Sequence, residues 1–224
     1  FASIETMKRM IDECHIFVLS GGFSAGDEPD GSGKFIANVL NNRKITDAIH
    51  SLLDRGGLIL GICNGFQALV KSGLLPYGRL GCVGKESPTL FRNDINRHVS
   101  QIVTTRVATV NSPWLSSFEV GELHSIAVSH GEGKFVVSDE MAEELFRNGQ
   151  VAFQYVDPDG NATLRAPYNP NGSSFGIEGI ISRDGHILGK MGHTERYEDG
   201  LFKNIAGNKV QEIFANAVNY FKGK

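Results

Sequence analysis

The sequence predicts an α/β protein in which a core sheet is extended by antiparallel strands. Three observations support this. Two short apolar runs, 15–19 and 58–62, alternate with helical stretches in the first third of the 224-residue chain. From about residue 98 onward, extended segments separated by turns replace that alternation. Neither internal repeats nor low-complexity tracts interrupt the pattern. Helices and strands that alternate early, followed by hairpins, are typical of an α/β core with an antiparallel extension.

The first third of the chain carries a local signal for each element. A helix begins the chain, with Ser3 as its expected N-cap. The run 15–19 is rich in β-branched and aromatic residues and ends at two glycines, so a buried strand is expected there. Gly73 stands where the left-handed C-cap of a helix belongs. After the first strand, the expected elements are a Gly/Asp/Pro-rich loop at 21–33, helices at 34–41 and 45–55, a strand at 58–62 and a helix at 64–72.

Extended segments dominate the rest of the chain. Asp-Pro-Asp-Gly at 157–160 and Arg-Asp-Gly at 183–185 are turn sequences, which favours antiparallel hairpins around them. A helix is expected near 139–148, and an amphipathic helix at 209–221 closes the chain. The extended segments lie near 98–110, 126–137, 151–156, 162–166, 175–181 and 186–191.

The composition is that of a soluble globular protein and argues against two kinds of partner. Hydrophobic residues make up 41% of the chain, enough for one sizeable core. A formal net charge of −3 leaves no basic stripe for phosphates, so nucleic acid is not an expected partner. No apolar stretch approaches the length that crosses a bilayer, and no signal peptide is recognisable. We therefore expect a cytoplasmic protein without a membrane partner.

Cys63 has the surroundings of a nucleophile. The segment 61–65, Gly-Ile-Cys-Asn-Gly, has the form Gly-x-nucleophile-x-Gly, which places the central residue on a tight turn between strand and helix. A helix N-terminus would favour its thiolate, and the N–H of Asn64 would face an oxyanion beside the sulfur. A buried structural cysteine is the alternative, but the paired glycines favour the nucleophile. Cys14 and Cys82 lack this setting and are predicted to be structural; three cysteines also argue against a disulfide framework.

His193 and Glu195 are the expected base and its orienting carboxylate. Both follow a predicted strand, and residues i and i+2 of extended backbone project from the same face. The carboxylate could fix the tautomer of the imidazole and stabilise the imidazolium formed when His193 takes the thiol proton. A weak surface ion pair is the alternative interpretation.

Three other kinds of site find no support. The remaining histidines form no HExxH motif and accompany no CxxC pair, so no metal site is predicted. The Gly-rich loop has Glu28 where a phosphate-binding loop needs glycine and Phe35 where it needs serine or threonine. The segment 157–161 resembles part of a calcium loop, but Ala162 occupies the position that needs glycine. We expect a hairpin turn there.

The segments 61–67 and 192–196 together resemble the class I, triad-type glutamine amidotransferases. More narrowly, the chain resembles the glutaminase domain of phosphoribosylformylglycinamidine synthase. Gly192 and Thr194 depart from the commoner pattern, which has proline at both places. The resemblance implies a three-layer, flavodoxin-like core with helices on both faces of the sheet, and it implies that strands preceding Ser3 are missing. Further segments that carry it are 20–27, 111–114, 129–135, 154–157 and 168–173.

The resemblance also implies roles for individual residues. Cys63 would form the glutamyl thioester, His193 would act as acid and base, and Glu195 would orient His193. The other implied roles are those of oxyanion-hole donors, Gly22 and Asn64, and of substrate-binding residues, Gln67 and His130.

The implied activity is hydrolysis of L-glutamine to glutamate and ammonia. The ammonia would serve the ATP-dependent conversion of formylglycinamide ribonucleotide to formylglycinamidine ribonucleotide in de novo purine biosynthesis. This domain would need no cofactor, because ATP and Mg²⁺ would belong to a synthetase domain or subunit that receives the ammonia. Residues 1–224 would form one glutamine amidotransferase domain, the C-terminal part of a longer chain.

Two other functions remain open from the sequence. The chain could be the glutaminase domain of another class I amidotransferase, or a related cysteine hydrolase. It could also be a catalytically inactive interaction or regulatory domain of the same fold.

Overall fold

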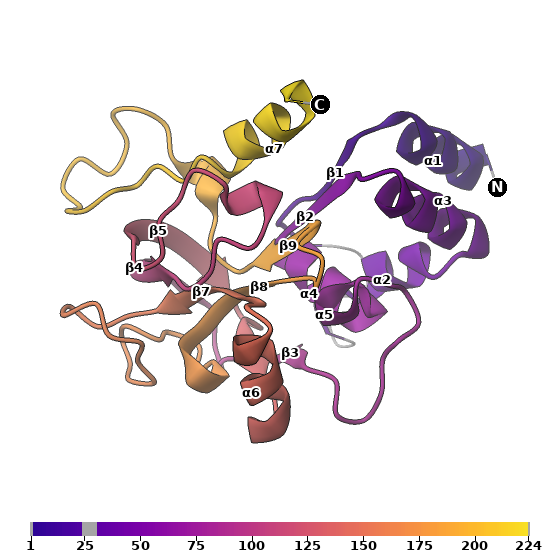
Figure 1. The fold of residues 1–224 in the computed structure, drawn as a ribbon. Coiled ribbons are helices and arrows are strands. Elements are labelled where there is room, and N and C mark those ends of the chain that lie inside the picture. The colour runs from indigo at the N-terminus through magenta and orange to yellow at the C-terminus, as the bar shows by residue number, and fades with distance from the viewer. Residues whose placement is uncertain (1, 24–30, 224) are drawn as a thin grey trace.

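The computed structural model describes residues 2–23 and 31–223 (Figure 1). Its first part alternates helices and strands as predicted. Gly73 ends the helix after Cys63 in the left-handed conformation, with φ 87°, and a short helix that was not predicted follows it. The elements are α1 (Ala2–Glu13), β1 (Ile16–Leu19), α2 (Lys34–Leu40), α3 (Arg43–Asp54), β2 (Leu58–Ile62), α4 (Asn64–Ser72) and α5 (Leu74–Tyr77). The predicted loop 21–33 and the segment 20–27 lie partly outside the described residues.

The second part is dominated by antiparallel strands, as predicted. Short 3-10 helices occupy Pro113–Leu115, Ser174–Gly176 and Thr194–Arg196. The other elements are β3 (Thr89–Phe91), β4 (Val99–Val107), β5 (Leu123–His130), β6 (Lys134–Val136), α6 (Asp139–Arg147), β7 (Val151–Tyr155), β8 (Ile177–Ile181), β9 (Ile187–Lys190) and α7 (Ile213–Lys222).

One mixed sheet organises these elements. Its seven strands lie in the order β1-β2-β9-β8-β7-β4-β5. The pairs β1/β2 and β2/β9 are parallel, whereas each later pair is antiparallel. The predicted α/β core with an antiparallel extension is therefore confirmed. The long connection from β2 to its parallel neighbour β9 carries the whole antiparallel part.

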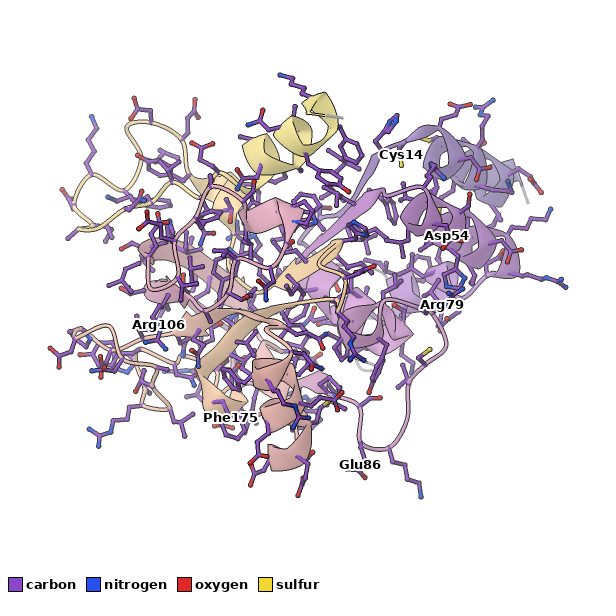
Figure 2. The ribbon with its side chains drawn as sticks, in the orientation of Figure 1. Cys14, Asp54, Arg79, Glu86, Arg106 and Phe175 are labelled. Atoms are coloured by element: carbon purple, nitrogen blue, oxygen red, sulfur yellow. The ribbon has the colours of Figure 1, made fainter. Side chains whose placement is uncertain are left out.

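Helices cover both faces of the core sheet. A Cβ at Gly189 of β9 would lie 2.2 Å from the ring of Phe66 in α4, so this residue faces α4 and α5. The next residue, Lys190, points to the opposite face and reaches Gln211, just before α7. Figure 1 shows α7 apart from α4 and α5, across the sheet. Buried apolar side chains from both parts of the chain form one core cluster. Figure 2 draws the described side chains on the ribbon.

Four local predictions differ from the structure. Ser3 is not an N-cap, because α1 already begins at Ala2. The expected strand 126–137 is two strands: β5 ends at His130, and β6 pairs with β3 in a separate sheet. Only Ala162 of segment 162–166 makes a β-bridge, because side chains bond the backbone there instead, as Thr163 does for the N–H of Arg165. Helix α7 begins at residue 213 because the Asn208 side chain accepts from the N–H of Val210 and holds a turn.

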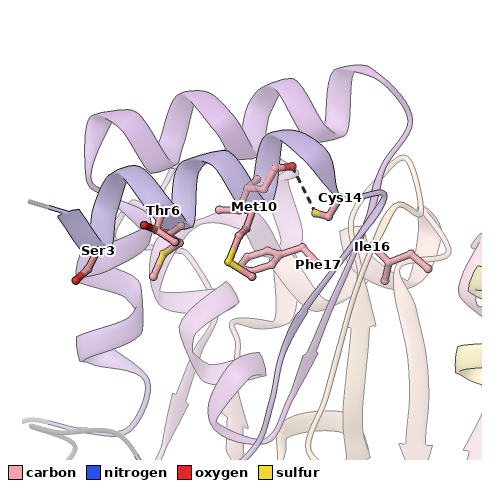
Figure 3. Close-up of a pocket in the computed structure, with 8 residues that line it drawn as sticks. Ser3, Thr6, Met10, Cys14, Ile16 and Phe17 are labelled. Atoms are coloured by element: carbon pink, nitrogen blue, oxygen red, sulfur yellow. Dashed lines mark hydrogen bonds between the residues drawn. The ribbon is translucent and has the colours of Figure 1, made fainter.

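β1 forms one edge of the sheet, beside an apolar groove between α1 and β1 (Figure 3). The groove has a volume of about 720 Å³ and is lined by residues such as Met10, Phe17 and Cys14. Cys14 donates its S–H to the carbonyl of Ile11, 3.4 Å away, and burial raises the pKa of its thiol. That strands preceding Ser3 are missing stays a prediction. Within residues 2–23 and 31–223, no helix has the length and apolar character needed to span a bilayer.

Candidate active site

Three parallel strands bring the predicted catalytic segments together at their carboxyl ends. Leu19 of β1 pairs with Gly61 of β2, and Ile62 pairs with Lys190 of β9. The strands therefore end side by side, and the segments that follow them lead to Gly21–Gly22, to Cys63 and to His193. In open α/β sheets, ligands bind at the carboxyl ends of the parallel strands. The register places the candidate nucleophile and base at these carboxyl ends.

Cys63 occupies the strained turn that the sequence predicts. Its backbone has φ 51° and ψ −106°, a conformation that side-chain-bearing residues rarely adopt, and helix α4 starts at the next residue. A Cβ at Gly65 would lie 2.0 Å from the carbonyl oxygen of Leu19, and one at Gly61 would lie 2.5 Å from Leu69. Both glycines are therefore required by close packing, which confirms the steric argument from the motif.

The helix N-terminus was expected to favour the thiolate of Cys63, but burial outweighs its effect. Burial raises the pKa of Cys63 to about 11, although hydrogen bonds from the backbone N–H groups of Asn64 and Gly22 oppose the rise. The thiol donates to the carbonyl oxygen of Ser129, with Sγ 3.7 Å away. The loss of hydration on burial destabilises the thiolate more than the helix dipole stabilises it. A base is needed to take its proton.

His193 and Glu195 form the expected pair. Nδ1 of His193 lies 2.6 Å from Oε1 of Glu195, and since a carboxylate only accepts hydrogen bonds, Nδ1 carries the proton. Nε2 is buried and has no hydrogen-bond partner among the described residues. Burial alone would raise the pKa of Glu195, but the bond from His193 and a backbone N–H bring it below its usual value. The imidazole is thus held in the tautomer that leaves Nε2 free to accept a proton.

Gly21 connects the two halves of the site. A Cβ at this position would lie 3.3 Å from Cβ of Cys63 and 2.7 Å from Cε1 of His193, so both side chains border it. The N–H groups of Gly22 and Asn64 point at the sulfur, as their effect on its pKa indicates. An oxyanion hole requires donors that face the oxyanion itself, so the roles of Gly22 and Asn64 as its donors stay predictions.

Gln67 and His130 line the same small cavity as Cys63 and His193. The Gln67 side chain donates from Nε2 to the carbonyl oxygen of Glu132, while its Oε1 is buried without a partner among the described residues. Burial lowers the pKa of His130 to about 4, so its ring is neutral near pH 7. The cavity encloses about 50 Å³, room for a few water molecules.

Comparison with known proteins identifies the family. A model of the CobB/CobQ-like glutamine amidotransferase domain matches residues 1–221. The chain belongs to this family. Among curated relatives of this glutamine amidotransferase are two proteins named phosphoribosylformylglycinamidine synthase subunit PurQ. The one from Gloeobacter violaceus is 35% identical over 202 residues, 90% of this chain and 79% of that protein. The one from Koribacter versatilis is 32% identical over 210 residues, 93% and 82% of the two chains.

Solved structures agree with this assignment. The structure of PurLQS from Thermotoga maritima matches with a TM-score of 0.68 and 29% identity, covering 94% of this amidotransferase chain and 81% of that chain. The glutaminase domain of CTPS from Trypanosoma brucei, solved with bound acivicin, matches with a TM-score of 0.51 and 13% identity, over 96% and 75% of the two chains. At that identity the second likeness shows the fold alone.

Sequence reasoning missed Arg196, and it named only His130 from a stretch that lines the cavity of this amidotransferase over residues 129–132. Glu132 accepts from the N–H of Ser32 at 2.8 Å, and Ser129 and Arg196 also border the site. The resemblance includes the segment 129–135, but its residue spacing does not reveal which of its side chains face Cys63. The pairing of Ala127 with His193 and the hydrogen bond from Cys63 to Ser129 bring the end of β5 to the site.

Gly21→Ala is expected to lower the kcat/KM for glutamine by about 10²-fold, because the new methyl group would displace the imidazole of His193 and small misplacements of catalytic groups have effects of this size. Initial rates of glutamate formation measure this. Gly84→Ala is the matched control, since among the described residues no heavy atom other than those of Gly84 and its chain neighbours lies within 4 Å of a Cβ there. Full activity of Gly21→Ala would show that the ring has room to shift.

Proposed function

We propose that this domain is the glutaminase of a phosphoribosylformylglycinamidine synthase. It hydrolyses L-glutamine to glutamate and ammonia through a thioester on Cys63. One observation supports the proposal above all: a cysteine on a strained turn and a histidine that is hydrogen-bonded to Glu195 line one small cavity, at the ends of adjacent parallel strands. Relatives over most of the chain carry the name of this synthase.

The proposed chemistry begins with proton transfer from Cys63 to Nε2 of His193. The sulfur attacks the amide carbon of glutamine, and the N–H groups of Asn64 and Gly22 stabilise the negative oxygen that forms. The carbon–nitrogen bond breaks, and the nitrogen leaves as ammonia with the proton from His193. Water then attacks the thioester, the carbon–sulfur bond breaks, and glutamate leaves while Cys63 regains a proton. Glu195 stabilises the imidazolium in both halves.

The ammonia must reach an acceptor before water protonates it, since ammonium is not a nucleophile. In this proposal the acceptor is a synthetase, in the same polypeptide or in a separate subunit, that binds ATP and Mg²⁺ and acts on formylglycinamide ribonucleotide. The match to PurLQS supports a partner of this kind. The small volume of the cavity also supports such a partner. At about 50 Å³ it is smaller than the roughly 300 Å³ or more of sites for drug-sized ligands, and in this proposal the cavity widens when glutamine binds.

The glutaminase rate is therefore expected to rise roughly 10²-fold when the synthetase is present, because docking can stabilise the widened site and align its catalytic groups. Steady-state glutamate formation, measured with and without the synthetase, tests this. Equal rates would overturn the coupling to the synthetase but not the proposed glutaminase activity. Absence of glutamate formation from both preparations would overturn the proposed function itself.

A further inference from the structure

Two ionisable side chains are buried behind the catalytic pair, outside the cavity. Glu178 on β8 and Lys190 on β9 are both 0% exposed, and Oε1 of the first lies 4.0 Å from Nζ of the second. Removing both charges of a buried pair from water largely offsets their attraction, so such pairs are weak contributors to stability. Lys190 also lies over the ring of Phe153, 5.2 Å from its centroid. The chemistry proposed above uses neither side chain.

Hydrogen bonds connect this pair to the backbone on both sides of His193. Oε1 of Glu178 accepts from the N–H of Gly192, the residue before it. Nζ of Lys190 donates to the hydroxyl of Thr194, the residue after it, at 2.9 Å, and to Oε1 of Gln211 at 2.8 Å. The Thr194 hydroxyl donates to the same Gln211 oxygen at 2.7 Å. The segment that presents His193 is therefore held at its two neighbours.

The packing around Gly192 leaves this segment little freedom. A Cβ at Gly192 would lie 2.8 Å from Oε1 of Glu178, 3.3 Å from Nζ of Lys190 and 2.7 Å from Ile126. The backbone at Gly192 thus packs directly against the ion pair. Glu178 can accept a hydrogen bond from residue 192 because this residue is not proline, which has no backbone N–H. On the far side, the N–H of His193 itself donates to Ala127 at 2.8 Å.

The charge of Lys190 also acts on the catalytic carboxylate. Burial raises the pKa of Glu195. The hydrogen bond from His193 and, to a smaller extent, the charge of Lys190 lower it. Burial lowers the pKa of Lys190, whereas Glu178 and Glu195 favour its charged form. Lys190 also faces His124 on β5, whose pKa burial lowers. Lys190 therefore interacts electrostatically with two carboxylates, and of these Glu195 is hydrogen-bonded to the catalytic histidine.

We propose that Glu178 and Lys190 are positioning residues for the general base. Through Gly192 and Thr194 they fix the position and orientation of the His193 imidazole relative to Cys63. This inference rests on the proposed glutaminase function. Both residues act through the 192–195 segment, and glutamine does not touch them. Loss of their hydrogen bonds should accordingly lower kcat and leave the KM for glutamine nearly unchanged.

Two double variants separate positioning from charge burial. Glu178→Leu/Lys190→Met and Glu178→Gln/Lys190→Met both remove the ion pair, so neither leaves a lone buried charge. They differ in the acceptor for the Gly192 N–H, which only glutamine supplies. The leucine variant is expected to lose about 10²-fold in kcat with KM changed less than about twofold, and the glutamine variant to recover about tenfold of that loss.

The control and a second readout complete the experiment. Gln150→Leu removes a buried amide that donates to Ile181, at the other end of β8, and should leave kcat unchanged. NMR of the His193 Nδ1–H proton reports its bond to Glu195 without any substrate, so it distinguishes failure of this inference from failure of the glutaminase proposal. An unaltered resonance and full kcat in a folded Glu178→Leu/Lys190→Met variant would overturn the inference.

Discussion

Cys63→Ala is expected to lower glutamine hydrolysis by about 10⁴-fold or more, because no other side chain at the cavity can form the thioester. The variant should remain folded. Only one sulfur atom is removed from a position that is 6% exposed, so the free energy of unfolding should change by less than about 2 kcal/mol. Glutamate release and thermal unfolding, measured on the same preparation with its synthetase, give both quantities.

The other two cysteines supply matched controls for this variant. Cys14 lies half-buried beside the α1–β1 groove, and Cys82 is exposed. Cys14→Ala and Cys82→Ala should both keep the activity of the parent chain. Hydrolysis that survives Cys63→Ala, or that disappears with either control in a folded sample, would remove Cys63 from the mechanism.

His193→Asn is expected to have the second large effect, and its pH dependence is distinctive. With a pKa of about 11, only about one Cys63 thiol in 10⁴ is ionised at pH 7 when no base takes the proton. The variant should therefore be about 10⁴-fold slower at pH 7. Because the thiolate fraction grows tenfold per pH unit below the pKa, its rate should rise about tenfold per unit towards pH 11.

Rates between pH 7 and 10 test this for the variant and the parent chain, whose profile should be much flatter. His15→Asn is the control, since His15 packs against Phe221 away from the cavity. A residual rate that does not depend on pH would contradict the role of His193 in taking the thiol proton. The same result would also question a pKa as high as 11 for Cys63 in the working enzyme.

Local features of the site could be predicted from the sequence because they depend on neighbours within a few residues. The turn at Cys63 needs small residues two positions away on either side, and Gly61 and Gly65 supply them. The pairing of His193 with Glu195 was predicted correctly, since they form a hydrogen bond, but the extended backbone expected there is wrong: Thr194–Arg196 form a short 3-10 helix. The alternation of helices and strands before residue 73 follows from periodicity in the same way.

Features that depend on distant partners could not be predicted. The raised pKa of Cys63 is the clearest case: its helix N-terminus is visible in the motif, but the burial that outweighs it comes from segments far along the chain. Glu132 and Ser129 reach the cavity only because the curled sheet returns the end of β5 to the end of β9. The Glu178–Lys190 pair likewise joins two strands that the sequence shows merely as extended.

The sequence by itself thus determined which groups carry the proposed chemistry, since nucleophile, base and orienting carboxylate are recognisable from spacing and from glycines beside a turn. Tertiary structure alone decided their surroundings: which strands lie side by side, what covers the thiol, and how the residues around His193 are held. The physical reason is one of range. Backbone sterics act over two or three residues, whereas desolvation and buried charge depend on every segment that packs against a site.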